Sequence, residues 1–110
     1  MMKIDKVAAD LGLVSLTPCE AEEFSGVYAG DFLSRAMSRV EEGELWITIM
    51  NNVNVVAVAS LTDAAAVVLA ENVGMAPEVL DAARQKGVAV FSSDKTVYEL
   101  CALIGAMDDE

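Results

Sequence analysis

The chain has 110 residues, which is long enough for one domain with its own hydrophobic core. Its net charge is −11, from 18 acidic and 7 basic residues, and a surface this acidic disfavours binding to nucleic acid or to an anionic membrane. Hydrophobic residues make up 55% of the chain and aromatic residues only 5%, which is typical of aliphatic side chains packed between helices and a sheet.

The N-terminal part of the chain predicts a helix followed by short extended segments. Residues 3–11 place apolar side chains at helical spacing, and Gly12 is a natural end for that helix. A short strand is expected at 13–16. The polar and acidic segment 17–26 is expected to be a surface connection, and 26–30 a short extended piece.

Asp31 is well suited to cap or begin a helix over residues 31–40. The predicted apolar face of this helix consists of Phe32, Leu33, Ala36, Met37 and Val40. Arg35 and Arg39 fall on the opposite face, where a solvated surface is a more ordinary role for them than an anion site.

Two strands are recognisable in the second half of the chain. Residues 45–50 are aromatic and β-branched with apolar side chains on both faces, as expected for a strand covered on both sides. Residues 88–91 form a second apolar run and predict a buried strand. Trp46, in the first of these strands, is expected in the core or at a dimer contact rather than as a stacking platform.

Each of these later strands is accompanied by a helix. Pro77 in the first turn and Gly87 as the stop delimit a helix over 76–87. Ser93 or Asp94 is expected to cap a last helix. The acidic tail at 108–110 is expected to fray.

Residues 51–72, NNVNVVAVASLTDAAAVVLAEN, allow three interpretations. A membrane span needs about 20 apolar residues, and polar side chains interrupt this segment. An antiparallel meander fits the β-branched pattern slightly better by periodicity alone. However, the alanines at 57, 59 and 64–66 suit a strand poorly, and no glycine marks a turn. We therefore expect a helix over about 52–61 and a buried strand over about 64–69.

With that assignment, strands and helices alternate from residue 45 onward, as in a parallel sheet with right-handed crossovers. The sequence thus predicts an α/β protein: a three-layer α/β/α sandwich with a mostly parallel sheet, formed by one domain over residues 1–107.

The two cysteines, Cys19 and Cys101, lie far apart, and the chain has no histidine. This pattern excludes the usual zinc-ligand arrangements and argues against a disulfide framework, so we expect no metal and no cofactor. The first residues carry early charges and lack the uninterrupted apolar stretch of a secretory signal. Together these features predict a cytoplasmic protein with reduced thiols.

The succession GVYAGDFLSRAM, GELWITIMNNVNVVAVASLTDAAAVVLAEN and VLDAARQKGVAVFSSDKTVYELC resembles the DRTGG domain family over most of the chain. Such domains resemble the N-terminal domain of HPr kinase/phosphorylase, and they accompany CBS domains in certain inorganic pyrophosphatases or an acetyltransferase domain in phosphotransacetylases. Stand-alone members are similar to small proteins found beside iron-only hydrogenase subunits in anaerobic bacteria. The resemblance implies a three-layer α/β/α fold that is usually dimeric.

The sequence departs from the family at the letters that name it. The residues that give the family its name are expected at two places. The first place follows the strand at 45–50, where this chain has Asn51-Asn52. Thr-Gly-Gly is expected after the strand at 64–69, where this chain has Ala70-Glu71-Asn72. The resemblance therefore transfers no ligand role to these positions.

Several kinds of catalysis are excluded by residue type. Without histidine there is no Ser-His or Cys-His pair, and no G-x-x-x-x-G-K-[ST] loop is present to hold a nucleotide's phosphates. The glycines form no G-x-G-x-x-G run. We therefore expect no enzymatic activity, including the kinase activity that the resemblance to HPr kinase suggests.

A binding function has a predicted location. In an open parallel α/β sheet, ligands bind beyond the carboxyl ends of the strands, near helix N-termini. The candidate ligand-binding residues at that edge are Gly30, Asp31, Asn51, Asn52, Asn54, Asn72, Ser92, Ser93 and Thr96. The same residue types are also ordinary helix caps and turn residues, which is the alternative for each of them.

Two non-catalytic functions are favoured, and an enzyme that uses Asp or Glu carboxylates is a third possibility. The first is a non-catalytic regulatory module, homodimeric, that senses a small molecule, for example an adenine nucleotide by analogy with the pyrophosphatase relatives. The second is a protein-interaction adaptor or assembly factor for a redox enzyme, such as an iron-only hydrogenase system, with no small ligand. The dimer is inferred from the 55% hydrophobic content, which predicts more apolar surface than one core can bury.

Overall fold

A five-stranded sheet forms the middle layer of the protein, in the strand order β2-β7-β6-β5-β4. The structure, a computed structural model, describes residues 1–107, so the predicted frayed tail at 108–110 lies outside the described residues. The strands are β2 (Val14–Ser15), β4 (Val27–Ala29), β5 (Leu45–Thr48), β6 (Ala66–Leu69) and β7 (Val90–Ser92). Strands β4, β5, β6 and β7 run parallel, and only the edge strand β2 is antiparallel to its neighbour.

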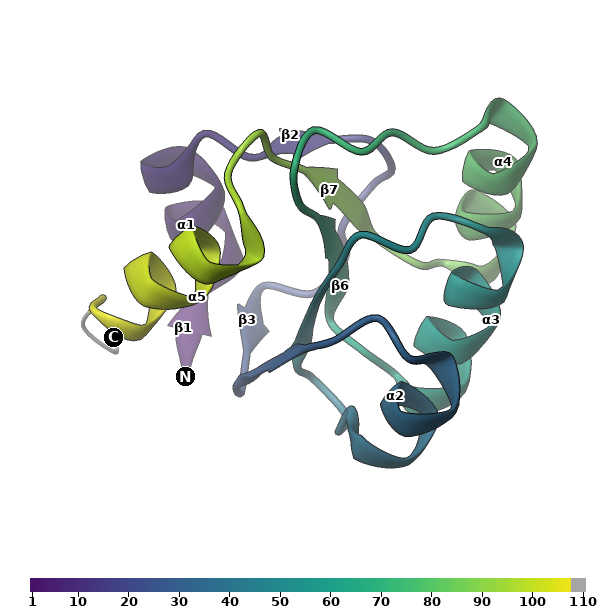
Figure 1. Cartoon of the computed structure of the whole chain (residues 1–110), viewed down its shortest axis with the longest axis horizontal. Helices are drawn as coiled ribbons and strands as arrows, with labels where there is room; N and C mark the ends of the chain where they lie inside the picture. Colours follow the sequence, from purple (N-terminus) through teal and green to yellow (C-terminus); the bar gives the residue numbers. More distant parts are fainter. Residues whose placement is uncertain (108–110) are drawn as a thin grey trace.

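Helices cover both faces of this sheet (Figure 1). On one side lie α1 (Ile4–Leu11) and α5 (Val97–Gly105); on the other lie α2 (Leu33–Arg39), α3 (Val53–Thr62) and α4 (Pro77–Lys86). Neighbouring residues of the central strands alternate between the two layers of core: Leu45 and Ile47 pack toward α1 and α5, whereas Trp46 packs toward α2, α3 and α4. The predicted three-layer α/β/α sandwich with a mostly parallel sheet is confirmed.

The central segment folds as a helix followed by a strand. Asn52 caps α3 by accepting a hydrogen bond from the backbone N–H of Asn54 at 3.0 Å, and β6 pairs with β5 in parallel. The antiparallel meander is therefore wrong. Its periodicity was misleading because α3 packs against α2 as well as α4, so its apolar residues are not confined to one face.

Two expectations in the first third of the chain are wrong. The segment at 17–26 is not only a surface connection, because β3 (Glu23–Phe24) pairs antiparallel with β1 (Met2–Lys3) in a small second sheet. Phe24 is 2% exposed and belongs to the core beneath α1 and α5. Conversely, Phe32 and Met37 were expected to face the core but are 69% and 52% exposed.

Helix starts also differ from expectation. Helix α2 begins at Leu33, and its N-cap is Phe32 rather than Asp31, without a side-chain cap. Helix α5 is capped by Thr96 rather than by Ser93 or Asp94. In residues 1–107, no helix combines the length and apolar character needed to cross a membrane.

Candidate functional site

The carboxyl ends of the four parallel strands lie at one edge of the sheet, and α2, α3, α4 and α5 begin there. We call this the carboxyl edge. It consists of the segments that follow β4, β5, β6 and β7, at residues 30–32, 49–52, 70–76 and 93–96. All the predicted ligand-binding residues lie on these segments or directly beside them, but most of their polar groups already have partners within the protein.

Gly30 and Asp31 connect the ends of β4 and β5. The backbone carbonyl of Gly30 accepts a hydrogen bond from the Trp46 indole at 2.9 Å. One carboxylate oxygen of Asp31 accepts hydrogen bonds from the Thr48 hydroxyl at 2.7 Å and from the backbone N–H of Ile49 at 2.9 Å. These contacts give both residues a structural role.

The asparagines after β5 serve loops and caps. The Asn51 amide donates to the carbonyl of Gly74 at 2.7 Å, which joins the loop after β5 to the loop after β6. Asn52 caps α3, and Asn54 lies exposed in the first turn of that helix. Thr96 forms a capping box with Glu99, in which each side chain accepts the other residue's backbone N–H.

The turn after β6 has an uncommon backbone. Glu71 and Asn72 both have φ of 58°, in the left-handed region that glycine favours. Their N–H groups donate to the carbonyls of Lys95 at 2.8 Å and Ser93 at 2.7 Å. These are the positions at which the family resemblance expects Gly-Gly. Glu71 and Asn72 therefore adopt the left-handed backbone conformation that the two expected glycines would adopt readily.

A hollow of about 270 Å³ opens beside this turn. Its lining residues, which define what we call the edge hollow, are Gly12, Val14, Asn72, Ser92, Ser93 and Asp94. Of the predicted ligand-binding residues, only Asn72, Ser92 and Ser93 are brought together in it. Gly12 and Val14 were missed as site residues because nothing in their sequence shows that β2 pairs antiparallel with β7, with Val14 opposite Ser92.

The edge hollow is polar and lacks positive charge. Among its lining residues within 1–107, Asp94 carries a charge and none is a lysine or arginine. Gly12 is the C-cap of α1, so the partially negative end of that helix faces the same place. A group that donates hydrogen bonds is therefore favoured there over an anion.

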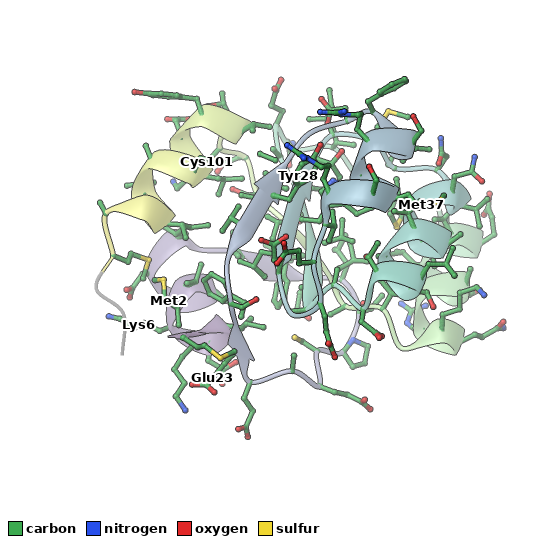
Figure 2. All side chains as sticks on the ribbon, turned by 90° about the horizontal axis from the view of Figure 1, so that it is seen from below. Met2, Lys6, Glu23, Tyr28, Met37 and Cys101 are labelled. Atoms are coloured by element: carbon green, nitrogen blue, oxygen red, sulfur yellow. The ribbon has the colours of Figure 1, made fainter. Side chains whose placement is uncertain are left out.

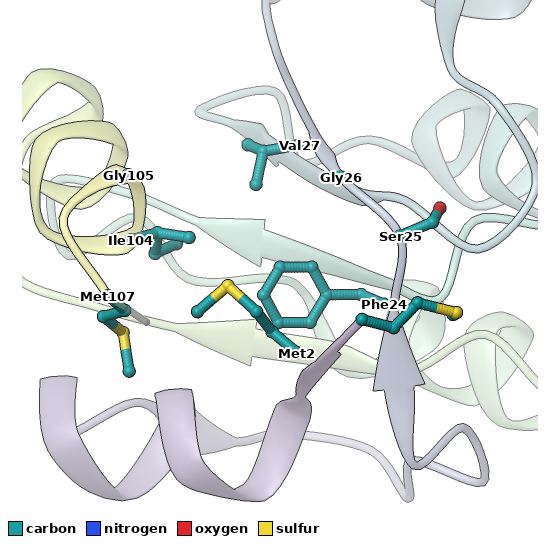
Figure 3. Close-up of a pocket in the computed structure, with 9 residues that line it drawn as sticks. Met2, Phe24, Ser25, Gly26, Val27, Ile104, Gly105 and Met107 are labelled. Carbon is teal, nitrogen blue, oxygen red and sulfur yellow. The ribbon is translucent and has the colours of Figure 1, made fainter. Parts of the chain in front are cut away.

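A second hollow, of about 260 Å³, lies where β1, β3 and the start of β4 meet the end of α5, and its lining is largely apolar. In Figure 3 the side chains of Met2, Phe24 and Ile104 point toward one another within it. Among its lining residues within 1–107, Ser25 alone has a polar side chain, so the described lining offers few of the convergent polar groups that orient a ligand.

A third hollow, of about 370 Å³, lies at the opposite edge of the sheet and is rimmed by the acidic residues Glu20, Glu23, Glu42 and Asp63. Residues 1–107 contain no group of three or more Cys, Asp and Glu residues arranged to bind a metal ion. We therefore do not assign a ligand to this acidic hollow.

The cysteines do not supply an activated nucleophile. Burial raises the pKa of the Cys19 thiol, although a backbone hydrogen bond with Ala21 acts in the opposite direction. Burial also raises the pKa of Cys101. Because the thiolate is the reactive form, both residues are poor nucleophiles at neutral pH.

Comparison with known proteins identifies the class. The DRTGG domain family matches residues 21–107, and the chain belongs to this family. No curated protein is detectably similar in sequence.

Among solved structures, the fold is similar to the CBS and DRTGG domains of the regulatory region of Clostridium perfringens pyrophosphatase, crystallised with its activator diadenosine tetraphosphate. The TM-score is 0.75 at 12% identity, over 94% of this chain and 46% of that chain. This chain therefore spans about half the length of the pyrophosphatase region, and the likeness shows the fold alone.

Proposed function

We propose that this protein is a non-catalytic regulatory module in which residues 1–107 form a single DRTGG domain that binds a small ligand of nucleotide character. The observation that supports this most is the edge hollow, because it collects polar side chains at the edge of a parallel sheet where ligands of α/β proteins bind. The similar pyrophosphatase region was crystallised with diadenosine tetraphosphate, which makes adenine compounds the first to test.

A thermal-shift panel of nucleosides, nucleotides and other metabolites tests this function. A ligand at one hundred times its Kd stabilises the folded state by about 2.7 kcal/mol, which is readily measured as a rise in Tm. We expect adenine compounds to raise the Tm of the wild-type protein, and an Asn72→Gly variant to lose the response. Glycine suits the left-handed backbone at this position, so this substitution removes the amide without straining the turn.

We propose further that the module is a homodimer acting in the cytoplasm. Large apolar side chains remain exposed on the monomer, including Tyr98 at 81%, Leu61 at 73% and Phe32 at 69%. In Figure 2 the edge strand β4, marked by Tyr28, lies between α5 on one side and α2, marked by Met37, on the other. Sedimentation equilibrium at micromolar concentration tests the dimer, and a monomer under these conditions contradicts it.

The same exposed apolar side chains favour a second candidate, a protein-interaction adaptor for a redox enzyme such as an iron-only hydrogenase system. It predicts no thermal shift with any small molecule and stable co-purification with a larger enzyme. A thermal shift abolished by Asn72→Gly favours the regulatory module over this adaptor.

A further inference from the structure

The negative charge at the edge hollow disfavours the binding of a phosphate group. The hollow's lining residues within 1–107 include the acidic Asp94 and no lysine or arginine, and the C-terminal end of α1 adds partial negative charge through Gly12. The protein as a whole carries a net charge of −11. A phosphate group entering the hollow would therefore be repelled by the acidic residue that lines it and by the net negative charge of the protein.

Several of the backbone donors that could bind phosphate at this edge already have partners within the protein. Phosphate sites in α/β proteins use free N–H groups of a turn and a helix N-terminus. Here the N–H groups of Glu71 and Asn72 donate to carbonyls of the 93–95 segment. The N–H of Lys95 donates to the Ser93 hydroxyl at 3.1 Å. At the start of α5, the capping box occupies the N–H groups of Thr96 and Glu99.

The volume of the edge hollow indicates the size of the group that it can hold. Small-molecule pockets usually measure about 300–1,000 Å³. At about 270 Å³ the edge hollow lies just below that range, which is room for one nucleoside-sized group.

From these observations we infer that the edge hollow binds the nucleoside end of the ligand, with its ribose hydroxyls donating to Asp94, and excludes phosphate. This inference rests on the function proposed above and specifies which part of the ligand enters the site. A carboxylate accepts hydrogen bonds from both vicinal hydroxyls of a ribose, and the Asn72 amide and Ser92 hydroxyl are able to donate to or accept from a base.

Isothermal titration of the wild-type protein with adenosine, 2′-deoxyadenosine, AMP and ATP at low ionic strength tests this inference. We expect adenosine to bind most tightly, AMP and ATP progressively less tightly, and 2′-deoxyadenosine about tenfold less tightly than adenosine, since it lacks one donor to Asp94. Affinity that rises from adenosine to ATP contradicts the inference and leaves the proposed function intact. Absence of binding by all four compounds contradicts both.

A charge-matched pair of variants tests the role of Asp94. Asp94→Asn removes the negative charge of this lining residue, and we expect it to weaken adenosine binding while reducing the preference for adenosine over AMP. Asp63→Asn removes the same charge at the opposite edge, at a left-handed position that asparagine tolerates, and should leave both affinities unchanged. Equal behaviour of the two variants contradicts a direct role for Asp94.

Discussion

Asp31 and Thr48 join the ends of two neighbouring strands through a hydrogen bond of 2.7 Å between the Thr48 hydroxyl and a carboxylate oxygen of Asp31. The same oxygen accepts the backbone N–H of Ile49 at 2.9 Å, and the Thr48 hydroxyl in turn accepts the N–H of Met50 at 3.1 Å. Thr48 is fully buried, so its hydroxyl has no access to water as a substitute partner. This network fixes the loop from which α3 starts.

The Asp31–Thr48 contact predicts a stability effect instead of a binding effect. Asp31→Ala removes the acceptor of two hydrogen bonds, and we expect the free energy of unfolding to fall by about 1–3 kcal/mol in urea denaturation. Asp31→Asn keeps an oxygen acceptor and should lose less. If Asp31→Ala unfolds at the same urea concentration as the wild type, the network does not stabilise the fold as described.

The left-handed turn predicts that glycine is preferred to glutamate at position 71. Glu71 has φ of 58°, which costs a residue with a Cβ atom about 1–2 kcal/mol relative to the right-handed region. Glu71→Gly should therefore raise the free energy of unfolding by about 0.5 kcal/mol, after the greater entropy of the unfolded glycine chain is subtracted. Chemical denaturation measures the change.

Glu78→Gly is the control for that experiment. Glu78 lies in the first turn of α4 and has no positive φ, so glycine there should lower stability by up to about 1 kcal/mol. The same sign of change at both positions contradicts the role assigned to the left-handed backbone.

Glu99 predicts a pH dependence of stability. Accepting the backbone N–H of Thr96 lowers the pKa of Glu99 below its ordinary value of 4.5, and the Thr96 side chain acts in the same direction. Because the folded pKa is the lower one, the ionised carboxylate stabilises the protein above the unfolded pKa, and this contribution is lost as pH falls through the folded pKa. The Tm difference between wild type and Glu99→Gln should therefore shrink as the pH is lowered from about 6 to about 3. Thermal unfolding of both proteins at a series of pH values in this range measures the difference. A difference that stays constant across the series contradicts this account.

Phe24 and Phe32 provide a matched test of the core. Phe24 is 2% exposed and Phe32 is 69% exposed, although the sequence pattern predicts the opposite. Phe24→Ala should lower the free energy of unfolding by about 3–5 kcal/mol, whereas Phe32→Ala should change monomer stability by no more than about 0.5 kcal/mol. Equal losses in the two variants contradict the placement of β3 against the core.

The fold was predictable from the sequence in the second half of the chain, but not around Phe24 and Phe32. The alternation of elements from residue 45 onward was predictable, because the strands at 45–48 and 66–69 are apolar on both faces and caps or stops mark the helices. The strand containing Phe24 was missed because it is only two residues long and pairs with residues near the N-terminus, so its stabilising contacts are nonlocal. Phe32 was misassigned because the helical periodicity was extended two residues too far toward the N-terminus, whereas α2 begins at Leu33.

The candidate site was predictable in location but not in composition. Chain order alone places Asn72, Ser92 and Ser93 at the carboxyl ends of strands. The partners that complete the edge hollow, Gly12 and Val14, come from the N-terminal segment through an antiparallel pairing that has no local signature. The structural roles of Asp31 and Asn51 likewise depend on hydrogen bonds to residues 18 and 23 positions away in the sequence. Local sequence patterns do not predict such long-range contacts.

Titration of the isotopically labelled protein with adenosine, followed by amide chemical shifts in NMR spectra, tests most directly whether this domain binds a nucleoside at the edge hollow. The account predicts saturable shifts concentrated at Gly12, Val14, Asn72 and residues 92–94, and their loss in Asn72→Gly. Unchanged spectra at saturating adenosine, or shifts concentrated instead around Met2, Phe24 and Met107, would contradict it.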